Sequence, residues 1–149
     1  MLRGMIAAGA LLAGLVALAP VVVAQSGVIA ERQQLMKGLS QAARAPGAML
    51  KGDSPFDLAA VQGTLKTFAE TGKKAPSLFP DNSKTGNDTA ALPTVWTKKA
   101  DFDAKWAKFE QDAVAAQAAI KDEASFKANF PNVLKSCGGC HEDYRAKKS

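Results

Sequence analysis

Both cysteines of the chain and its only histidine lie within five residues near the C-terminus, in the stretch KSCGGCHEDYR. Cys137, Cys140 and His141 follow the spacing C-x-x-C-H, which is used to attach haem covalently. On a helix, residues three and four apart share a face, so both sulfurs can reach one porphyrin edge while the imidazole lies under the iron. Gly138 and Gly139 let that edge approach the backbone. The motif therefore predicts one covalent haem c, with two thioether bonds and His141 as an axial iron ligand.

Other uses of these side chains fit the sequence less well. A disulfide between Cys137 and Cys140 would close a loop too small to stabilise a fold. A thioredoxin-like dithiol belongs at the start of a helix in a βαβ fold, and no strand pattern is found here. A structural zinc ion takes four ligands, whereas the chain has two cysteines and one histidine.

The first two dozen residues have the composition of a secretory signal peptide. A basic residue is followed by an apolar run, and Val22 and Ala24 place small residues before a cleavage site. We therefore expect a signal peptide at 1–24, a single exported domain at 25–149, and no membrane span after cleavage. The alternative is an uncleaved anchor, because the apolar run is about long enough to cross a bilayer.

Length and charge limit the organisation of the chain and its partners. A chain of 149 residues with 47% apolar content builds one core and is short for two domains. The net charge of +5 falls to about +4 without the signal peptide. No lysine or arginine cluster is interleaved with aromatic residues, so we expect no nucleic-acid partner. The mild positive charge suits an acidic partner surface but does not require one.

Apolar residues recur at helical spacing throughout the mature chain. Helices are predicted at about 28–43, 57–74, 93–120 and 122–147. Each carries an apolar stripe, and the clearest stripe comprises Phe102, Trp106, Phe109, Ala113, Ala116 and Ile120. Four amphipathic helices in one small domain bury their stripes against each other. We therefore expect an all-α fold, an antiparallel four-helix bundle with covalently bound haem.

Prolines and glycines predict where these helices are interrupted. Pro46 is expected to break or kink the first helix, Gly72 to end the second, and Pro131 to bend the last. The stretch from Lys73 to Pro93 is long and rich in Pro, Gly, Asn and Asp. Such loops in compact domains tend to be functional or partly disordered. Its SLFP segment is expected to pack against the bundle.

The mature chain resembles the class II c-type cytochromes, the family of cytochrome c′ and its low-spin relatives. The resemblance rests on the C-terminal haem motif followed by EDYR, on RQQLM at Arg32–Met36, on LFP at Leu78–Pro80, and on ALPTVW leading into ADF at Ala91–Phe102. It implies a left-twisted antiparallel bundle, a periplasmic location and often a homodimer. It also implies a protein that passes single electrons to a redox partner on one haem c and has no catalytic residues.

The resemblance leaves the sixth iron position open. The chain has no second histidine, so a protein ligand opposite His141 would be a methionine, and Met36 is the candidate. A Met36 thioether would raise the reduction potential and favour electron transfer. If Met36 only packs, the haem stays five-coordinate and binds nitric oxide or carbon monoxide without turnover. We expect ligation, and we expect Met49 to pack.

Two arginines are expected near the haem. The resemblance places Arg145 near the axial imidazole, four residues after His141. Arg32 lies one turn before Met36, where it can pair with a haem propionate. The alternative for both is an ordinary solvated cation.

Overall fold

A computed structural model describes residues 19–147, with side chains at 27–147. Its long helices are α1 (Ala19–Ala42), α3 (Leu58–Lys74), α5 (Lys99–Ala119) and α6 (Glu123–Tyr144). The connections contain the short helices α2 (Arg44–Lys51) and α4 (Thr94–Thr97) and the 3-10 turns η1 (Ala75–Leu78) and η2 (Asp81–Ser83). Over 19–147 the chain forms no strand, which confirms the predicted all-α class.

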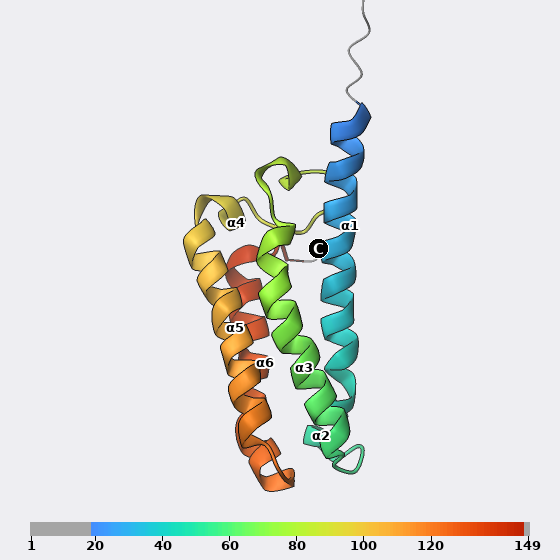
Figure 1. Ribbon diagram of the computed structural model, residues 1–149, viewed down its shortest axis with the longest axis vertical. Coiled ribbons are helices and arrows are strands. Elements are labelled where there is room, and N and C mark those ends of the chain that lie inside the picture. Colours follow the sequence, from blue (N-terminus) through green and yellow to red (C-terminus); the bar gives the residue numbers. More distant parts are fainter. Residues whose placement is uncertain (1–18, 148–149) are drawn as a thin grey trace, which may run out of the picture.

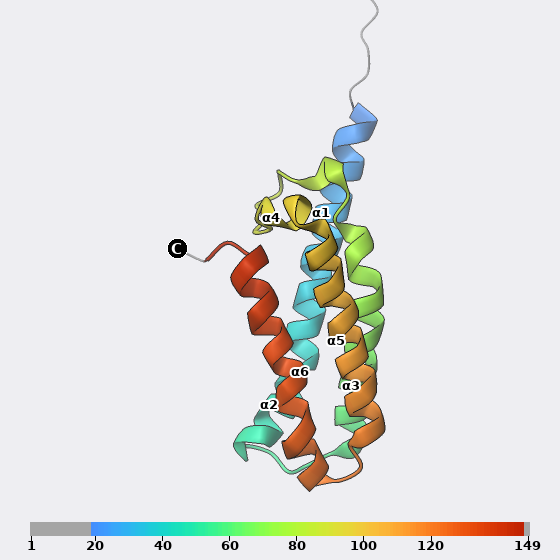
Figure 2. The same cartoon turned by 90° about the vertical axis from the view of Figure 1, so that its left-hand side faces the viewer.

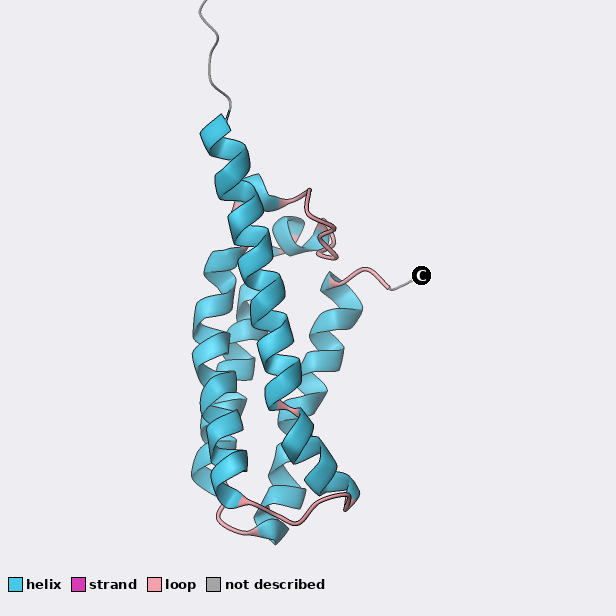
Figure 3. Cartoon of the chain, turned by 90° about the vertical axis from the view of Figure 1, so that its right-hand side faces the viewer, coloured by secondary structure: helices cyan, strands magenta, loops and turns pink. Residues whose placement is uncertain are grey.

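The four long helices form an antiparallel bundle, as predicted. In Figure 1, α1 and α5 run downward and α3 and α6 run upward. α3 packs closely against α5, and α5 packs against α6. α6 diverges from α1 toward its C-terminal end, as Figures 2 and 3 show. The divergence matters because the motif residues lie on this part of α6.

Aromatic side chains fill the centre of the bundle. Every residue of the stripe predicted on α5 is buried. The ring of Phe68 on α3 lies 5.4 Å from that of Phe109 on α5 and 6.2 Å from that of Phe130 on α6, measured between centroids. Phe126 and Ile120 are fully buried. Contacts of this kind hold α3, α5 and α6 in one core.

Both ends of the bundle differ from the predicted boundaries. α1 begins at Ala19, before the predicted start near Val28. Residues 1–18 of the predicted signal peptide lie outside the described residues, and cleavage after Ala24 stays a prediction. No helix among the described residues is long and apolar enough to cross a membrane. α6 ends at Tyr144, before the predicted Lys147, because Arg145 takes extended backbone and forms a β-bridge with Ala91.

Two of the predicted helix breaks were wrong in detail. α1 ends at Ala42, four residues before Pro46, which lies in the first turn of α2, where its missing N–H costs little. Gly72 does not end α3, which continues to Lys74. A Cβ on Gly72 would lie 2.9 Å from the Cβ of Glu110, so this glycine allows α3 and α5 to approach closely. α6 is continuous through Pro131.

The long connection after α3 is ordered and packs against the bundle. Leu78 and Phe79 are buried, which confirms the prediction for the SLFP segment. Gly86, Asn87 and Asp88 have φ values of 99°, 45° and 49°. Glycine, asparagine and aspartate tolerate this left-handed conformation better than other residues. The turn they form reverses the chain before α4.

Candidate haem-binding site

The register of α6 is set at its first turn. Asp122 Oδ1 accepts a hydrogen bond from Ser125 N at 2.8 Å, and Ser125 Oγ accepts one from Asp122 N at 3.0 Å. This reciprocal pair is a capping box, which fixes where the helix starts. From there the continuous helix carries Cys137, Cys140 and His141 on one face. All three side chains are half-buried, and both thiols are free.

Two adjoining cavities are lined by α1, α5 and α6. The first, about 410 Å³, has Cys137, Cys140 and His141 on α6 and Met36 on α1 among its lining residues. The second, about 360 Å³, shares Met36, Cys140 and His141 and extends to the loop at 88–91. Both lie in the usual size range of small-molecule sites. The remaining walls are largely apolar and include Leu39, Ala43, Phe68, Phe79, Val95, Phe102, Trp106, Phe109, Leu134 and Tyr144.

Burial sets the protonation of the motif side chains. It raises the pKa of the Cys137 and Cys140 thiols, which keeps them protonated at neutral pH. Burial, with the positive charge of Arg145, lowers the pKa of His141. The imidazole is therefore neutral, which is the form that binds a metal. Arg145 is exposed to solvent, but it lines both cavities.

Arg32 is a buried cation, only 3% exposed. Its Nη1 donates to Ser83 Oγ at 2.8 Å and to Leu78 O at 3.3 Å. Its Nη2 donates to Ser83 O at 2.9 Å and to Thr89 Oγ1 at 2.6 Å. None of these partners is charged, and burial lowers the pKa of the guanidinium. Because Arg32 also lines the second cavity, its charge favours an anionic group there.

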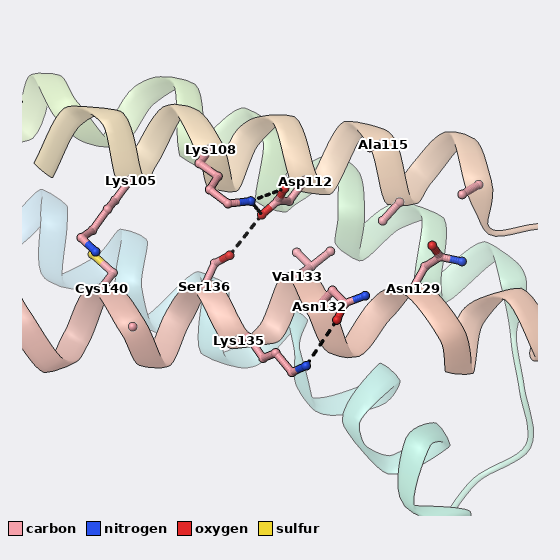
Figure 4. A pocket seen from close by; sticks show the side chains of 13 residues that line it. Lys105, Lys108, Asp112, Ala115, Asn129, Asn132, Val133, Lys135, Ser136 and Cys140 are labelled. Carbon is pink, nitrogen blue, oxygen red and sulfur yellow. Dashed lines mark hydrogen bonds and ion pairs between the residues drawn. The ribbon is translucent and has the colours of Figure 1, made fainter. Parts of the chain in front are cut away.

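A third hollow lies on another side of Cys140, in a groove of about 570 Å³ between α5 and α6 (Figure 4). Its rim is polar. Lys108 pairs with Asp112 at 2.7 Å, and Ser136 Oγ donates to the same carboxylate at 3.3 Å. Cys140 lines this groove and both cavities, whereas His141 lines only the cavities. Cys140 therefore lies between the two cavities and the groove that α5 and α6 form.

The cavities have the features that a covalent haem requires. They bring together two free thiols, a neutral imidazole, a thioether, apolar walls and a buried cation that lacks a charged partner. No group of three or more His, Cys, Asp or Glu side chains that could hold a bare metal ion occurs among the described residues.

Some features of the site could not be found from the sequence. Tyr144 is buried at the end of α6, and its hydroxyl donates to Asp101 on α5. Burial and this hydrogen bond raise the pKa of Tyr144. The loop at 88–91 forms a cavity wall, and Trp106 Nε1 has no acceptor among the described residues. Each feature depends on contacts between distant segments, for which the sequence contains no local signal.

Comparison with known proteins identifies the family. The profile of the family described as Cytochrome C′ matches residues 27–145. The chain belongs to the cytochrome c′ family. It is 52% identical to a cytochrome c′ of Rhodopseudomonas palustris over 94% of this chain and 97% of that protein. It is 39% identical to a cytochrome c-556 of the same organism, over 99% of both chains. The solved structure of a cytochrome c′ from R. palustris matches with a TM-score of 0.80 at 53% identity, covering 82% of this chain and 98% of that one.

Membership of the cytochrome c′ family confirms three predictions from the sequence: the family, the four-helix bundle and the covalent haem c. It also supports a c-type cytochrome that carries electrons, as its relatives named cytochrome c′ and cytochrome c-556 indicate. Cys137, Cys140, His141 and Met36 all line the cavity of about 410 Å³. Which of their atoms bind the haem and the iron stays a prediction.

Proposed function

We propose that this protein carries single electrons in the periplasm on one haem c, with Met36 as the sixth iron ligand. The observation that carries the proposal is that Met36 of α1 and His141 of α6 line the same two cavities. Cys137 and Cys140, one turn or less from His141, would hold the porphyrin edge. The bound haem supplies a one-electron iron couple.

The two thiols account for covalent attachment without a redox cofactor. Each S–H would add across one vinyl double bond of the haem, with the sulfur bonding one carbon and the hydrogen going to the other. No oxidant or reductant is consumed. The half-buried positions of Cys137 and Cys140 at the cavity wall would fix the porphyrin edge against α6.

The two arginines that line the second cavity would have different roles toward the haem. Arg32 lines the second cavity as a buried cation without a carboxylate partner, so it would offset the negative charge of a haem propionate. Arg145 lies one turn after His141 and lowers the pKa of the imidazole by its charge. It would thereby keep His141 in the neutral, ligating form.

Met36 decides between electron transfer and gas binding. A thioether that stays on the iron in both oxidation states keeps reorganisation small, which favours electron transfer. If Met36 only packs against the porphyrin, the open iron position binds nitric oxide or carbon monoxide. Met36 is half-buried and lines both cavities, which supports a contact between its side chain and a haem bound there.

We further propose a periplasmic location after removal of residues 1–24, a protein redox partner, and a homodimer as in the family. The composition of the N-terminus supports export. The protein would have no catalytic residues of its own, because its relatives are named as cytochromes c′ and c-556. The proposal of a homodimer rests on the family resemblance and not on any surface feature of the structure.

Optical spectra of the purified protein test the sixth ligand. Both oxidation states should be low-spin, the ferric form should show the weak far-red sulfur-to-iron band, and carbon monoxide should bind slowly. Met36→Leu keeps the side-chain volume and removes the sulfur, so it should give a high-spin haem and a lower potential. Met49→Ala is the control, because Met49 is buried in the core and lines neither cavity. A high-spin ferrous spectrum of the wild type would overturn Met36 ligation.

A further inference from the structure

We propose that Thr89 is a positioning residue, which sets the spacing of α1 and α6 across the haem cavities and thereby the contact between Met36 and the iron. The inference builds on the proposed role of Met36. It concerns the segment 79–93, here named the bridging loop, which lies between η1 and α4.

The bridging loop is fastened to α1 one turn before Met36. Arg32 Nη2 donates to Thr89 Oγ1 at 2.6 Å, and Gln33 Nε2 donates to Asn87 O at 2.9 Å. Hydrogen bonds from a charged donor are stronger than neutral ones, and Arg32 is almost completely buried. Thr89, which is half-buried, is therefore held against α1 by a short hydrogen bond from a charged donor.

The same loop is fastened to the end of α6 just after His141. The amide of Ala146 donates to Ala90 O at 2.8 Å, and the amide of Leu92 donates to the carbonyl of Tyr144 at 3.0 Å. These bonds form the β-bridge that ends α6. At the start of α4, Thr94 Oγ1 donates to the carbonyl of Asp143 at 2.8 Å.

Thr89 and Ala90 are neighbours in the chain, so the two attachments are one peptide unit apart. The path from α1 to α6 runs from Arg32 to Thr89, along the backbone to Ala90, and then to Ala146. The left-handed turn at 86–88 presents Thr89 to Arg32, with Thr89 N donating to Gly86 O at 3.1 Å. The connection between α1 and the end of α6 is therefore short, with one peptide unit between its two hydrogen bonds.

Direct packing does not set this spacing. α1 and α6 are not among the closely packed pairs of described helices, and α6 diverges from α1 beside the cavities. The helices that carry Met36 and His141 are linked indirectly through α3 and α5, and the bridging loop is the direct connection between them beside the cavities. Loss of the Arg32–Thr89 bond should let them move apart and weaken the contact of Met36 with the iron.

Thr89→Val in the haem-loaded protein tests this inference, because it removes the hydroxyl and keeps the shape. We expect the carbon monoxide association rate of the ferrous protein to rise about five- to tenfold, the effect of losing the bond from Arg32, since the second bond to the hydroxyl, from Ala91 N, is long at 3.3 Å. The far-red band should weaken, and the amides of Leu92 and Ala146 should exchange faster with solvent. Thr89→Ser should restore all three quantities. Thr67→Val is the matched control, since Thr67 Oγ1 donates only to Gly63 O on an exposed face of α3.

The results of this experiment distinguish a failure of the Thr89 role from a failure of Met36 ligation. A wild-type protein that is already high-spin would contradict Met36 ligation, but Thr89→Val should still speed carbon monoxide entry by loosening the cavity. An unchanged association rate in Thr89→Val, with faster exchange at Leu92 and Ala146, would overturn the positioning role. If Thr89→Val does not fold, Thr94→Val tests the α6 attachment by the same rate and the same exchange.

Discussion

The two tryptophans of the chain differ in how their indole N–H groups are satisfied. Trp96 Nε1 donates to the carbonyls of Phe79 and Pro80, both at 3.1 Å, and so joins α4 to the bridging loop. Trp106 Nε1 is buried and has no acceptor among the described residues. Removing a buried donor costs stability only where it had a partner. The predicted apolar stripe contained Trp106 correctly, but the stripe gives no information on where the indole N–H points.

Substitution by phenylalanine should change the free energy of unfolding by different amounts at the two tryptophans. Both changes remove the same atoms, but Trp106 is buried and Trp96 half-buried, so lost packing weighs against Trp106→Phe and lost hydrogen bonds against Trp96→Phe. We expect the two hydrogen bonds of Trp96 to be the larger effect. Trp96→Phe should lower the free energy of unfolding by about 1–2 kcal/mol more than Trp106→Phe does. Denaturant unfolding of the holoprotein, followed by circular dichroism, measures both. Equal losses for the two variants would show that the Trp96 bonds contribute little.

At the scale of elements, one glycine fixes how α3 and α5 pack. The sequence around Gly72 suggested a helix end, because glycine is common there. The structure gives it another use, since its missing side chain makes room for Glu110 of the neighbouring helix. The four long helices could be predicted from periodicity, because each stripe is local to its own segment. The neighbour that each glycine contacts depends on packing between helices, so it could not be predicted from periodicity.

Gly72 and Gly63 provide a matched pair on α3. A Cβ at Gly63 meets no atom within 4 Å, whereas one at Gly72 meets both the backbone and the Cβ of Glu110. Gly63→Ala should stabilise the protein by about 0.5–1 kcal/mol through helix propensity. Gly72→Ala should destabilise it by about 1–3 kcal/mol through overpacking. Thermal unfolding of both variants measures the effect, and a stabilising Gly72→Ala would contradict the close approach of α3 and α5.

At the scale of the whole molecule, the bundle encloses the cavities proposed to hold the haem. C-x-x-C-H identified the cofactor from the sequence, since both cysteines and the only histidine lie in one motif. The walls of those cavities could not be predicted, because they come from α1, α5, α6 and the bridging loop together. Arg32 illustrates the difference. Its position one turn before Met36 was visible in the sequence, but its hydrogen bonds to the loop were not.

Removing the haem should therefore loosen much of the fold. Without the haem, the largely apolar walls of a cavity of about 410 Å³ would face water instead of the porphyrin. A small domain is only marginally stable, so the loss of that apolar burial should unfold part of the bundle. We expect far-ultraviolet circular dichroism to show markedly less helix in the apoprotein than in the holoprotein. Identical spectra would show that the bundle folds without its cofactor.

The capping box at Asp122 and Ser125 has a consequence for the length of α6. An α-helix turns by about 100° per residue, so each position beyond the cap has a fixed direction. One residue inserted or deleted between Ser125 and Cys137 would rotate all three motif side chains by about 100° about the helix axis, while the cap kept its place. Cys137, Cys140 and His141 would then face away from Met36. Along this segment the number of residues is constrained more tightly than their identity.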